Sequence, residues 1–95
     1  MTVAYIYRDT ASGTGKQLYE EILGQVMEKG KPEGLVLHVA GEVAGGEWKV
    51  LEVWESDEAR ERFGQERLFP VFKQHGLDVT SGPQPERLEV KNLIR

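Results

Sequence analysis

The chain has 95 residues, no cysteine, and 16 acidic against 12 basic side chains, which give a formal net charge of −4. This length suits one small domain that would gain stability from a second copy of itself, and the acidic balance without a basic stripe argues against nucleic acid as a partner. The absence of cysteine excludes disulfides and thiolate metal sites and fits the cytoplasm, where we expect the protein. No signal peptide and no apolar run long enough to span a membrane is found, so no membrane partner is expected.

The first part of the chain predicts a strand, a helix and a second strand. Residues 2–7 are β-branched and aromatic, which is typical of a strand. Thr14 has the position of a helix cap, and apolar residues then recur at helical spacing, so a helix is predicted over 14–29. Gly30 ends this helix, and residues 35–43 predict the second strand.

A glycine pair separates the second strand from a third. Gly45 and Gly46 can supply the positive φ angles of a tight hairpin, and residues 48–55 predict the third strand. Ser56 has the side chain of a helix N-cap, and the two acidic residues after it suit the positive end of a helix. A second helix is therefore predicted to begin at Ser56.

The second helix is predicted to contain a break. Its apolar pattern runs to Gly76, but Pro70 has no amide hydrogen, so the helix should kink or restart near Phe69. Residues 82–85 predict a rigid linker, and residues 87–94 alternate weakly as a fourth strand. The order β-α-β-β-α-β predicts a ferredoxin-like α+β fold, with a four-stranded antiparallel sheet and both helices on one face of it.

Alternation along the central strands separates two kinds of side chain. One set, here called the aliphatic face, consists of Leu35, Leu37, Val39, Leu51 and Val53. The other set, here called the mixed face, consists of Val36, His38, Ala40, Trp48, Val50, Glu52 and Trp54. We expect the aliphatic face, with Ala4 and Ile6, to lie under the helices. The mixed face, with Tyr5 and Tyr7, would then be open.

The mixed face brings His38 and Glu52 close together if the hairpin has the right register. The two residues lie directly opposite only if paired residue numbers sum to 90, which requires an odd hairpin loop rather than a two-residue turn at Gly45 and Gly46. An apolar and aromatic surface with a few polar groups is typical of a small-molecule site. The same surface is also compatible with a filled interface between two copies, so a cavity and a packed interface are both open interpretations.

Several motifs together resemble the dimeric α+β barrel superfamily, and in particular the antibiotic biosynthesis monooxygenase-like proteins. The residues that carry the resemblance are His38-Val-Ala-Gly, Gly-Gly-x-Trp48, Val-x-x-Val-Trp54-x-Ser56, Phe63, Leu68-x-Pro70 and Gly76. The resemblance implies a homodimer whose sheets pack face to face, with a pocket in each subunit. The superfamily includes cofactor-free quinone-forming oxygenases, haem-degrading enzymes, isomerases and members without a known activity.

The resemblance implies a cofactor-independent monooxygenase-like protein that acts on a small aromatic or polyketide-like substrate, with no metal. In this hypothesis His38 is the base that deprotonates the substrate, and Glu52 is its partner. The substrate would be held by the aromatic side chains Trp54, Tyr5, Trp48, Phe63 and Phe69. The alternative is a non-catalytic homodimer of the same fold that binds a small apolar ligand or has a structural role.

A haem-degrading function fits the sequence less well. The haem-degrading relatives carry a tryptophan where this chain has Phe63, and a haem-ligating histidine near the position of Lys73. They also carry an asparagine on the first strand where this chain has a tyrosine. His75 is two residues away from the ligand position, which rotates it by about 200° around a helix. No cofactor is therefore expected.

Other polar motifs have simpler explanations. The segment from Gly13 to Lys16 is too short for a phosphate-binding loop, and His75 is expected at the surface near a helix C-terminus. Phe69 and Phe72 are expected to be either core residues or a lid over the pocket. The charged residues of the two helices are predicted to be solvated; they are Glu20, Glu21, Glu58, Arg60, Glu61 and Arg62.

Overall fold

The protein is described by a computed structural model that covers residues 1–8, 15–76 and 84–94, with residues 15–19 described as backbone. The predicted order of elements is confirmed, with the second helix divided into three segments. The elements are β1 (Val3–Arg8), α1 (Gly15–Val26), β2 (Leu35–Glu42), β3 (Trp48–Trp54), α2 (Asp57–Phe63), η1 (Gly64–Leu68), α3 (Phe69–Gln74) and β4 (Glu86–Glu89). The predicted Thr14 cap, the Gly13 segment and the first part of the linker at 82–85 lie outside the described residues.

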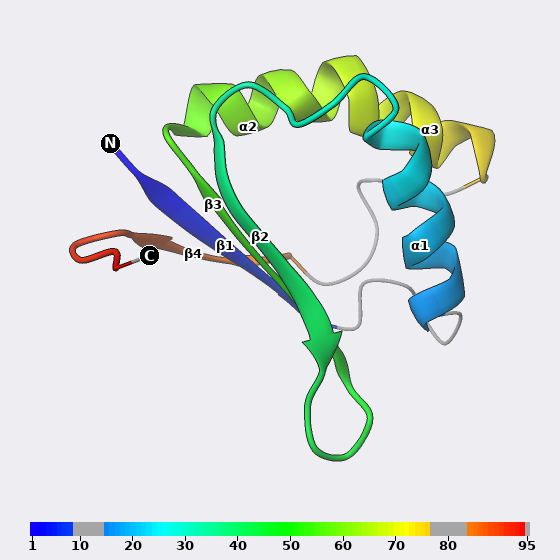
Figure 1. The fold of residues 1–95 in the computed structure, drawn as a ribbon, viewed down its shortest axis with the longest axis horizontal. Helices are drawn as coiled ribbons and strands as arrows, with labels where there is room; N and C mark the ends of the chain where they lie inside the picture. Colours follow the sequence, from blue (N-terminus) through cyan, green and yellow to red (C-terminus); the bar gives the residue numbers. More distant parts are fainter. Residues whose placement is uncertain (9–14, 77–83, 95) are drawn as a thin grey trace.

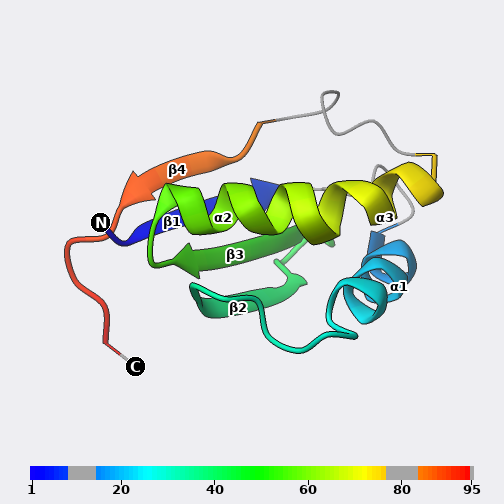
Figure 2. The ribbon, with the colours of Figure 1, turned by 90° about the horizontal axis from the view of Figure 1, so that it is seen from above.

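The strands form one four-stranded sheet in the order β2-β3-β1-β4, and each strand is antiparallel to its neighbours. Figure 1 shows this sheet almost edge-on, with all the helices on one side of it. Seen from above, α2 runs along the sheet over β1 and β3, while α1 lies beside α3 (Figure 2). The ferredoxin-like α+β fold is therefore confirmed, with helices over one face of the sheet.

The hairpin between β2 and β3 has the odd loop that an opposed His38 and Glu52 require. The amide of Val43 donates to the carbonyl of Glu47 at 2.9 Å, so residues 44–46 form the loop. The amide of Gly46 closes a turn to the carbonyl of Val43 at 2.9 Å, and Gly45 has a φ of 100°, which a side chain would disfavour. His38 pairs with Glu52, as predicted.

A register shift in β2 changes which residues share a face. Leu35 pairs with Trp54, but Leu37 pairs with Val53, so an extra residue lies between the two pairs. Because Trp54 and Val53 are neighbours on β3, they point to opposite faces. Leu35 therefore shares a face with Trp54 rather than with Leu37. The prediction that Leu35 belongs to the aliphatic face was wrong.

The helices cover the mixed face, so the prediction that they cover the aliphatic face was also wrong. The main core cluster consists of Val3, Tyr5, Ile22, Val26, Leu35, Trp54, Ala59 and Phe63. Its strand residues belong to the mixed face, where the rings of Trp54 and Phe63 lie 5.3 Å apart. Large aromatic rings bury more apolar surface than aliphatic side chains do, and their polar tips find partners inside the fold.

The aliphatic face is the open one, and it consists of two rows that cross the sheet. The first row is Leu37, Val53, Ala4 and Leu88, and the second is Val39, Leu51, Ile6 and Glu86. Ala4 and Ile6, expected under the helices, belong to these rows instead. Val39 is 51% exposed and Leu88 is 45% exposed, whereas the smaller Ala4 and Val53 between the outer residues are buried.

The second helix is capped at its start and contains a π-helical turn. The amide of Ala59 donates to Ser56 Oγ at 3.1 Å, which confirms the predicted N-cap. The π-helical segment η1 precedes α3, which starts at Phe69 with Pro70 in its first turn, so the predicted restart near Phe69 is confirmed. Such turns occur often at functional sites. No helix among the described residues is long and apolar enough to cross a bilayer.

The strand β4 is shorter than predicted, because its partner strand ends. Glu89 pairs with Val3, the first residue of β1, and the amide of Val90 then reaches the carbonyl of Thr2 at 3.0 Å. Beyond this point β1 has no further strand residues to pair with. The predicted strand over 87–94 is therefore observed only as Glu86–Glu89.

Candidate functional site

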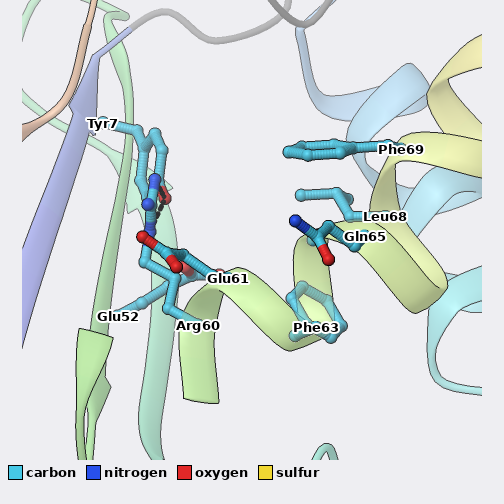
Figure 3. Close-up of a pocket in the computed structure, with 9 residues that line it drawn as sticks. Tyr7, Glu52, Arg60, Glu61, Phe63, Gln65, Leu68 and Phe69 are labelled. Atoms are coloured by element: carbon cyan, nitrogen blue, oxygen red, sulfur yellow. Dashed lines mark hydrogen bonds between the residues drawn. The ribbon is translucent and has the colours of Figure 1, made fainter. Parts of the chain in front are cut away.

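A cavity of about 100 Å³ lies between the mixed face and the second helix. It is lined by Tyr7, Glu52, Arg60, Glu61, Phe63, Gly64, Gln65, Leu68 and Phe69. Figure 3 shows a polar wall, formed by Tyr7, Glu52 and Arg60, that faces an apolar wall formed by Leu68 and Phe69. The cavity therefore has polar side chains on one side and apolar side chains on the other.

The carboxylate of Glu52 is held by two neighbours on the same face. His38 Nδ1 lies 3.2 Å from Glu52 Oε2, and Trp54 Nε1 donates to Glu52 Oε1 at 3.2 Å. The side chains of His38 and Glu52 are only 18% and 14% exposed, so water screens their interaction weakly. Glu52 lines the cavity, whereas His38 lies on the next strand and does not line it.

Arg60 of α2 reaches down to the two tyrosines of β1. Its Nε and Nη2 atoms donate to Tyr7 Oη at 3.1 and 2.8 Å. Its guanidinium carbon lies 3.8 Å from the centre of the Tyr5 ring, a cation–π contact that helps to fix its position. Burial and, after it, the nearby Glu52 carboxylate together raise the pKa of Tyr7 to about 12, against the opposing charge of Arg60. The Tyr7 hydroxyl is therefore protonated at neutral pH.

A second polar cluster fixes the start of α2 to the edge of the sheet. The Tyr5 hydroxyl donates to Asp57 Oδ1, and Arg87 of β4 donates to both Asp57 oxygens at 3.1 and 2.7 Å. These hydrogen bonds, from Arg87 first, lower the pKa of Asp57 to about 2. Burial and the Asp57 hydrogen bond raise the pKa of Tyr5. The cluster holds Tyr5 in place beneath Arg60.

The predicted site residues are brought together only in part. Phe63 and Phe69 line the cavity with Glu52. Trp54 is fully buried beneath Phe63, and Tyr5 contacts Arg60 rather than the cavity. Trp48 pairs with Glu42 at the hairpin end of the sheet and is not among the residues that line the cavity.

Arg60 is the residue of this site that the sequence interpretation missed. It was predicted as part of a solvated helix face, but its side chain is half-buried against the sheet. A signal was present in the sequence, because Arg60 lies three and four residues before Phe63 and Gly64, which are buried. Residues at this spacing share one face of a helix, so Arg60 belongs to the side of α2 that faces the sheet.

Lys73 and His75, the residues compared with the haem-ligating position, do not line the cavity. Lys73 is exposed, and His75 Nε2 lies 2.8 Å from Gln25 Oε1, between α3 and α1. Among residues 1–8, 15–76 and 84–94, no group of three or more histidine, aspartate or glutamate side chains is placed to hold a metal ion.

Several solved structures with this arrangement of strands and helices are named as monooxygenases or oxygenases. A Chloroflexus aurantiacus protein, provisionally named an antibiotic biosynthesis monooxygenase, matches with a TM-score of 0.73 and 12% identity over 100% of this chain and 98% of its own. SnoaB, a cofactor-independent oxygenase from Streptomyces nogalater, matches with a TM-score of 0.65 and 14% identity over 98% and 96%. The chain has the antibiotic biosynthesis monooxygenase-like fold. The likeness is one of structure, which is preserved at identities where sequence similarity is faint.

A haem-related protein shares the same fold. The haem-degrading protein Rv3592 of Mycobacterium tuberculosis matches with a TM-score of 0.59 and 20% identity over 100% of both chains. No protein-family model matches the chain, and no curated protein sequence matches it either. Proteins of this one fold therefore carry different activities, and the function must be argued from the residues at the cavity.

Proposed function

We propose that the protein is a cofactor-independent monooxygenase-like enzyme that acts on a small phenolic compound. The observation that carries this proposal is the position of Glu52, whose carboxylate lines the cavity opposite Leu68 and Phe69 while His38 contacts it from the neighbouring strand. An aromatic ring fits between the apolar side chains, and its hydroxyl then meets a proton acceptor.

The proposed reaction needs only the substrate, oxygen and a base. Glu52, with His38 as its proton-sharing partner, removes the phenolic proton and makes the ring carbanion-like. The ring carbon para to the phenolate oxygen then reacts with O₂ and its C–H bond breaks. One oxygen atom becomes the second carbonyl of a quinone, and the other leaves as water with the C–H and O–H hydrogens of the phenol. The substrate supplies all the electrons, so no external reductant is required. This assignment reverses the predicted roles, because Glu52 rather than His38 faces the cavity.

The size of the cavity favours a substrate with one ring. A cavity of about 150 Å³ is enough for benzene in an engineered protein, whereas drug-sized ligands need about 300 Å³ or more. The observed volume is about 100 Å³. Phe69 is 42% exposed and forms one wall, so a rotation of its ring would enlarge the cavity toward solvent. A one-ring substrate would require a small rotation of this kind, and a polyketide-like substrate would require a larger one.

Oxygen uptake with a panel of phenols and hydroquinones tests the proposal. We expect uptake by the wild type, at least a tenfold loss in Glu52→Gln, which keeps the shape but removes the base, and a smaller loss in His38→Ala. Glu58→Gln on the exposed side of α2 is the matched control and should retain full activity. Uptake unchanged in Glu52→Gln would contradict the assignment of the base.

One observation favours a second function, the binding of a phenol without turnover. Both Glu52 oxygens already have partners, Trp54 and His38, so this carboxylate is also suited to act as a fixed hydrogen-bond acceptor. Isothermal titration with the same phenols separates the two functions. Binding without oxygen uptake for any phenol would leave the binding protein as the better description.

We also propose that two copies pair through the aliphatic face to form a homodimer. Its first row is apolar on all four strands and its second row on β2, β3 and β1, and the rows include the exposed Leu37, Val39 and Leu88. An exposed apolar patch of this kind marks an interaction surface. In a dimer with two-fold symmetry, both copies contribute the same surface to the interface, and here that surface would be the aliphatic face. A cytoplasmic location stays a prediction from the lack of cysteine.

Sedimentation equilibrium tests the dimer. We expect a dimer for the wild type and a folded monomer for Val39→Glu, because this substitution would bury a carboxylate next to Leu37 and Leu51 on the aliphatic face. Glu42→Gln, on the same strand but exposed outside the two rows, is the control and should remain dimeric. A dimer that survives Val39→Glu would place the interface elsewhere.

A further inference from the structure

The guanidinium of Arg60 is held firmly, yet part of its hydrogen-bonding capacity is unused. Arginine has five N–H donors in a planar fork. Two of those in Arg60 point to Tyr7 Oη, and the Tyr5 ring lies against the planar group. Within the described part of the chain, Arg60 has no carboxylate within ion-pair distance and no other hydrogen-bond acceptor. An oriented cation that lines a cavity is therefore available to an anionic ligand atom.

Two opposite charges lie near the Tyr7 hydroxyl, at the polar wall of the cavity. The Glu52 carboxylate and the Arg60 guanidinium act on it in opposite directions, so both charges lie near it. All three side chains belong to the same wall (Figure 3). A ligand oxygen that enters beside Tyr7 would therefore meet a proton acceptor and a cation at once.

We propose that Arg60 binds the ionised oxygen of the ligand, so that this site selects phenols as their phenolates. The proposal deepens the function proposed above and rests on the same cavity. Arg60 would touch the ligand, whereas Tyr5 and Tyr7 would act as positioning residues that hold the guanidinium. Leu68 and Phe69 on the opposite wall would pack against the ring.

The charges balance when a phenol enters the cavity. The O–H bond of the phenol breaks, the proton moves to the Glu52 carboxylate, and the electron pair stays on the phenolate oxygen. Before this step Glu52 carries a negative charge, and after it the ligand does, while Glu61, which also lines the cavity, keeps its own charge throughout. The Arg60 cation therefore has an anion nearby both before and after the proton transfer. The negative charge moves from Glu52 to the oxygen of the ligand.

Binding of 4-nitrophenol tests the proposal, because its phenolate is yellow and its ionisation can be followed without any turnover. An opposite charge at close range lowers the pKa of an acid by about 1 to 3. We expect wild-type protein to lower the pKa of bound 4-nitrophenol by this amount. The Arg60→Met variant should lose most of this decrease in the pKa of the bound 4-nitrophenol. The control Arg62→Met removes an exposed charge from the same helix and should keep the full decrease.

Two further variants separate a direct contact from a structural role. Arg60→Lys keeps the charge and should retain part of the lowered pKa, and Tyr7→Phe should weaken it while far-ultraviolet circular dichroism stays unchanged. The proposal is overturned if wild-type protein does not bind 4-nitrophenol, binds it without lowering its pKa, or lowers it equally in folded Arg60→Met. A lowered pKa without oxygen uptake from any phenol would support the Arg60 assignment and contradict only the monooxygenase function.

Discussion

On the mixed face of the sheet the polar side chains have partners within the fold, whereas the aliphatic face ends in exposed leucine and valine. Glu52 contacts His38 and Trp54, and Tyr7 contacts Arg60, all beneath the helices. On the other side, Val39 is 51% exposed. In this fold the helices therefore do not cover the more aliphatic face of the sheet. They can cover the face that carries the chemistry and leave the aliphatic one for another surface.

The largest expected effect separates the two faces by stability. Trp54→Ala removes a fully buried ring and should lower the free energy of unfolding by about 3 to 5 kcal/mol. Val39→Ala should change it by less than about 1 kcal/mol at concentrations where the protein is monomeric, because half of that side chain is exposed. Urea unfolding followed by circular dichroism measures both. Equal losses would show that the helices do not cover the mixed face.

Deprotonation of Tyr7 at high pH is expected to lower the free energy of unfolding by less than Trp54→Ala does. Its pKa is raised from 10.0 to about 12, so the folded state holds this proton more tightly than the unfolded state does. The resulting stabilisation of about 3 kcal/mol is complete below pH 10 and is lost as the pH rises through 12. Tyr7→Phe should lose this part of the alkaline dependence in urea unfolding between these pH values. Parallel curves for the two proteins would contradict the buried position of Tyr7.

A pair of glycine-to-alanine substitutions tests how closely the Phe69 ring packs against Gly64 beside the cavity. Gly24→Ala in α1 meets no atom within 4 Å and should raise stability by about 0.5 to 1 kcal/mol. At Gly64 an added Cβ would lie 3.0 Å from the Phe69 ring, so Gly64→Ala should lack this gain and displace the ring. Thermal unfolding compares the pair. A gain at Gly64 as large as at Gly24 would mean that Phe69 does not pack on η1.

The smallest effect is expected at the edge of the sheet, where the Arg87 and Asp57 pair is partly exposed. The pKa of Asp57 is lowered from 3.8 to about 2, so its stabilising effect is complete above pH 3.8 and is lost as the pH falls toward 2. Asp57→Asn should weaken the loss of stability over this acid range. Urea midpoints at several pH values measure it, with Glu58→Gln as the control at the neighbouring exposed carboxylate. An acid dependence as steep as in the wild type would show that Asp57 is not held by Arg87.

The sequence predicted the order of elements, the Ser56 cap and the pairing of His38 with Glu52, because each depends on local patterns. The face covered by helices was predicted wrongly, because it depends on which side chains bury more surface once the layers meet. The register shift between Leu35 and Leu37 had no glycine or proline to mark it. Arg60 was missed because a charged residue is usually solvated, and its contacts with Tyr5 and Tyr7 exist only in three dimensions.

Changes in amide chemical shifts on addition of 4-nitrophenol locate the ligand site, which we place on the mixed face beneath the helices. We expect the largest changes at Tyr7, Glu52, Arg60 and Phe69. Largest changes at Leu37, Val39 and Leu51 instead would place the ligand on the aliphatic face, and the proposed site would then be wrong.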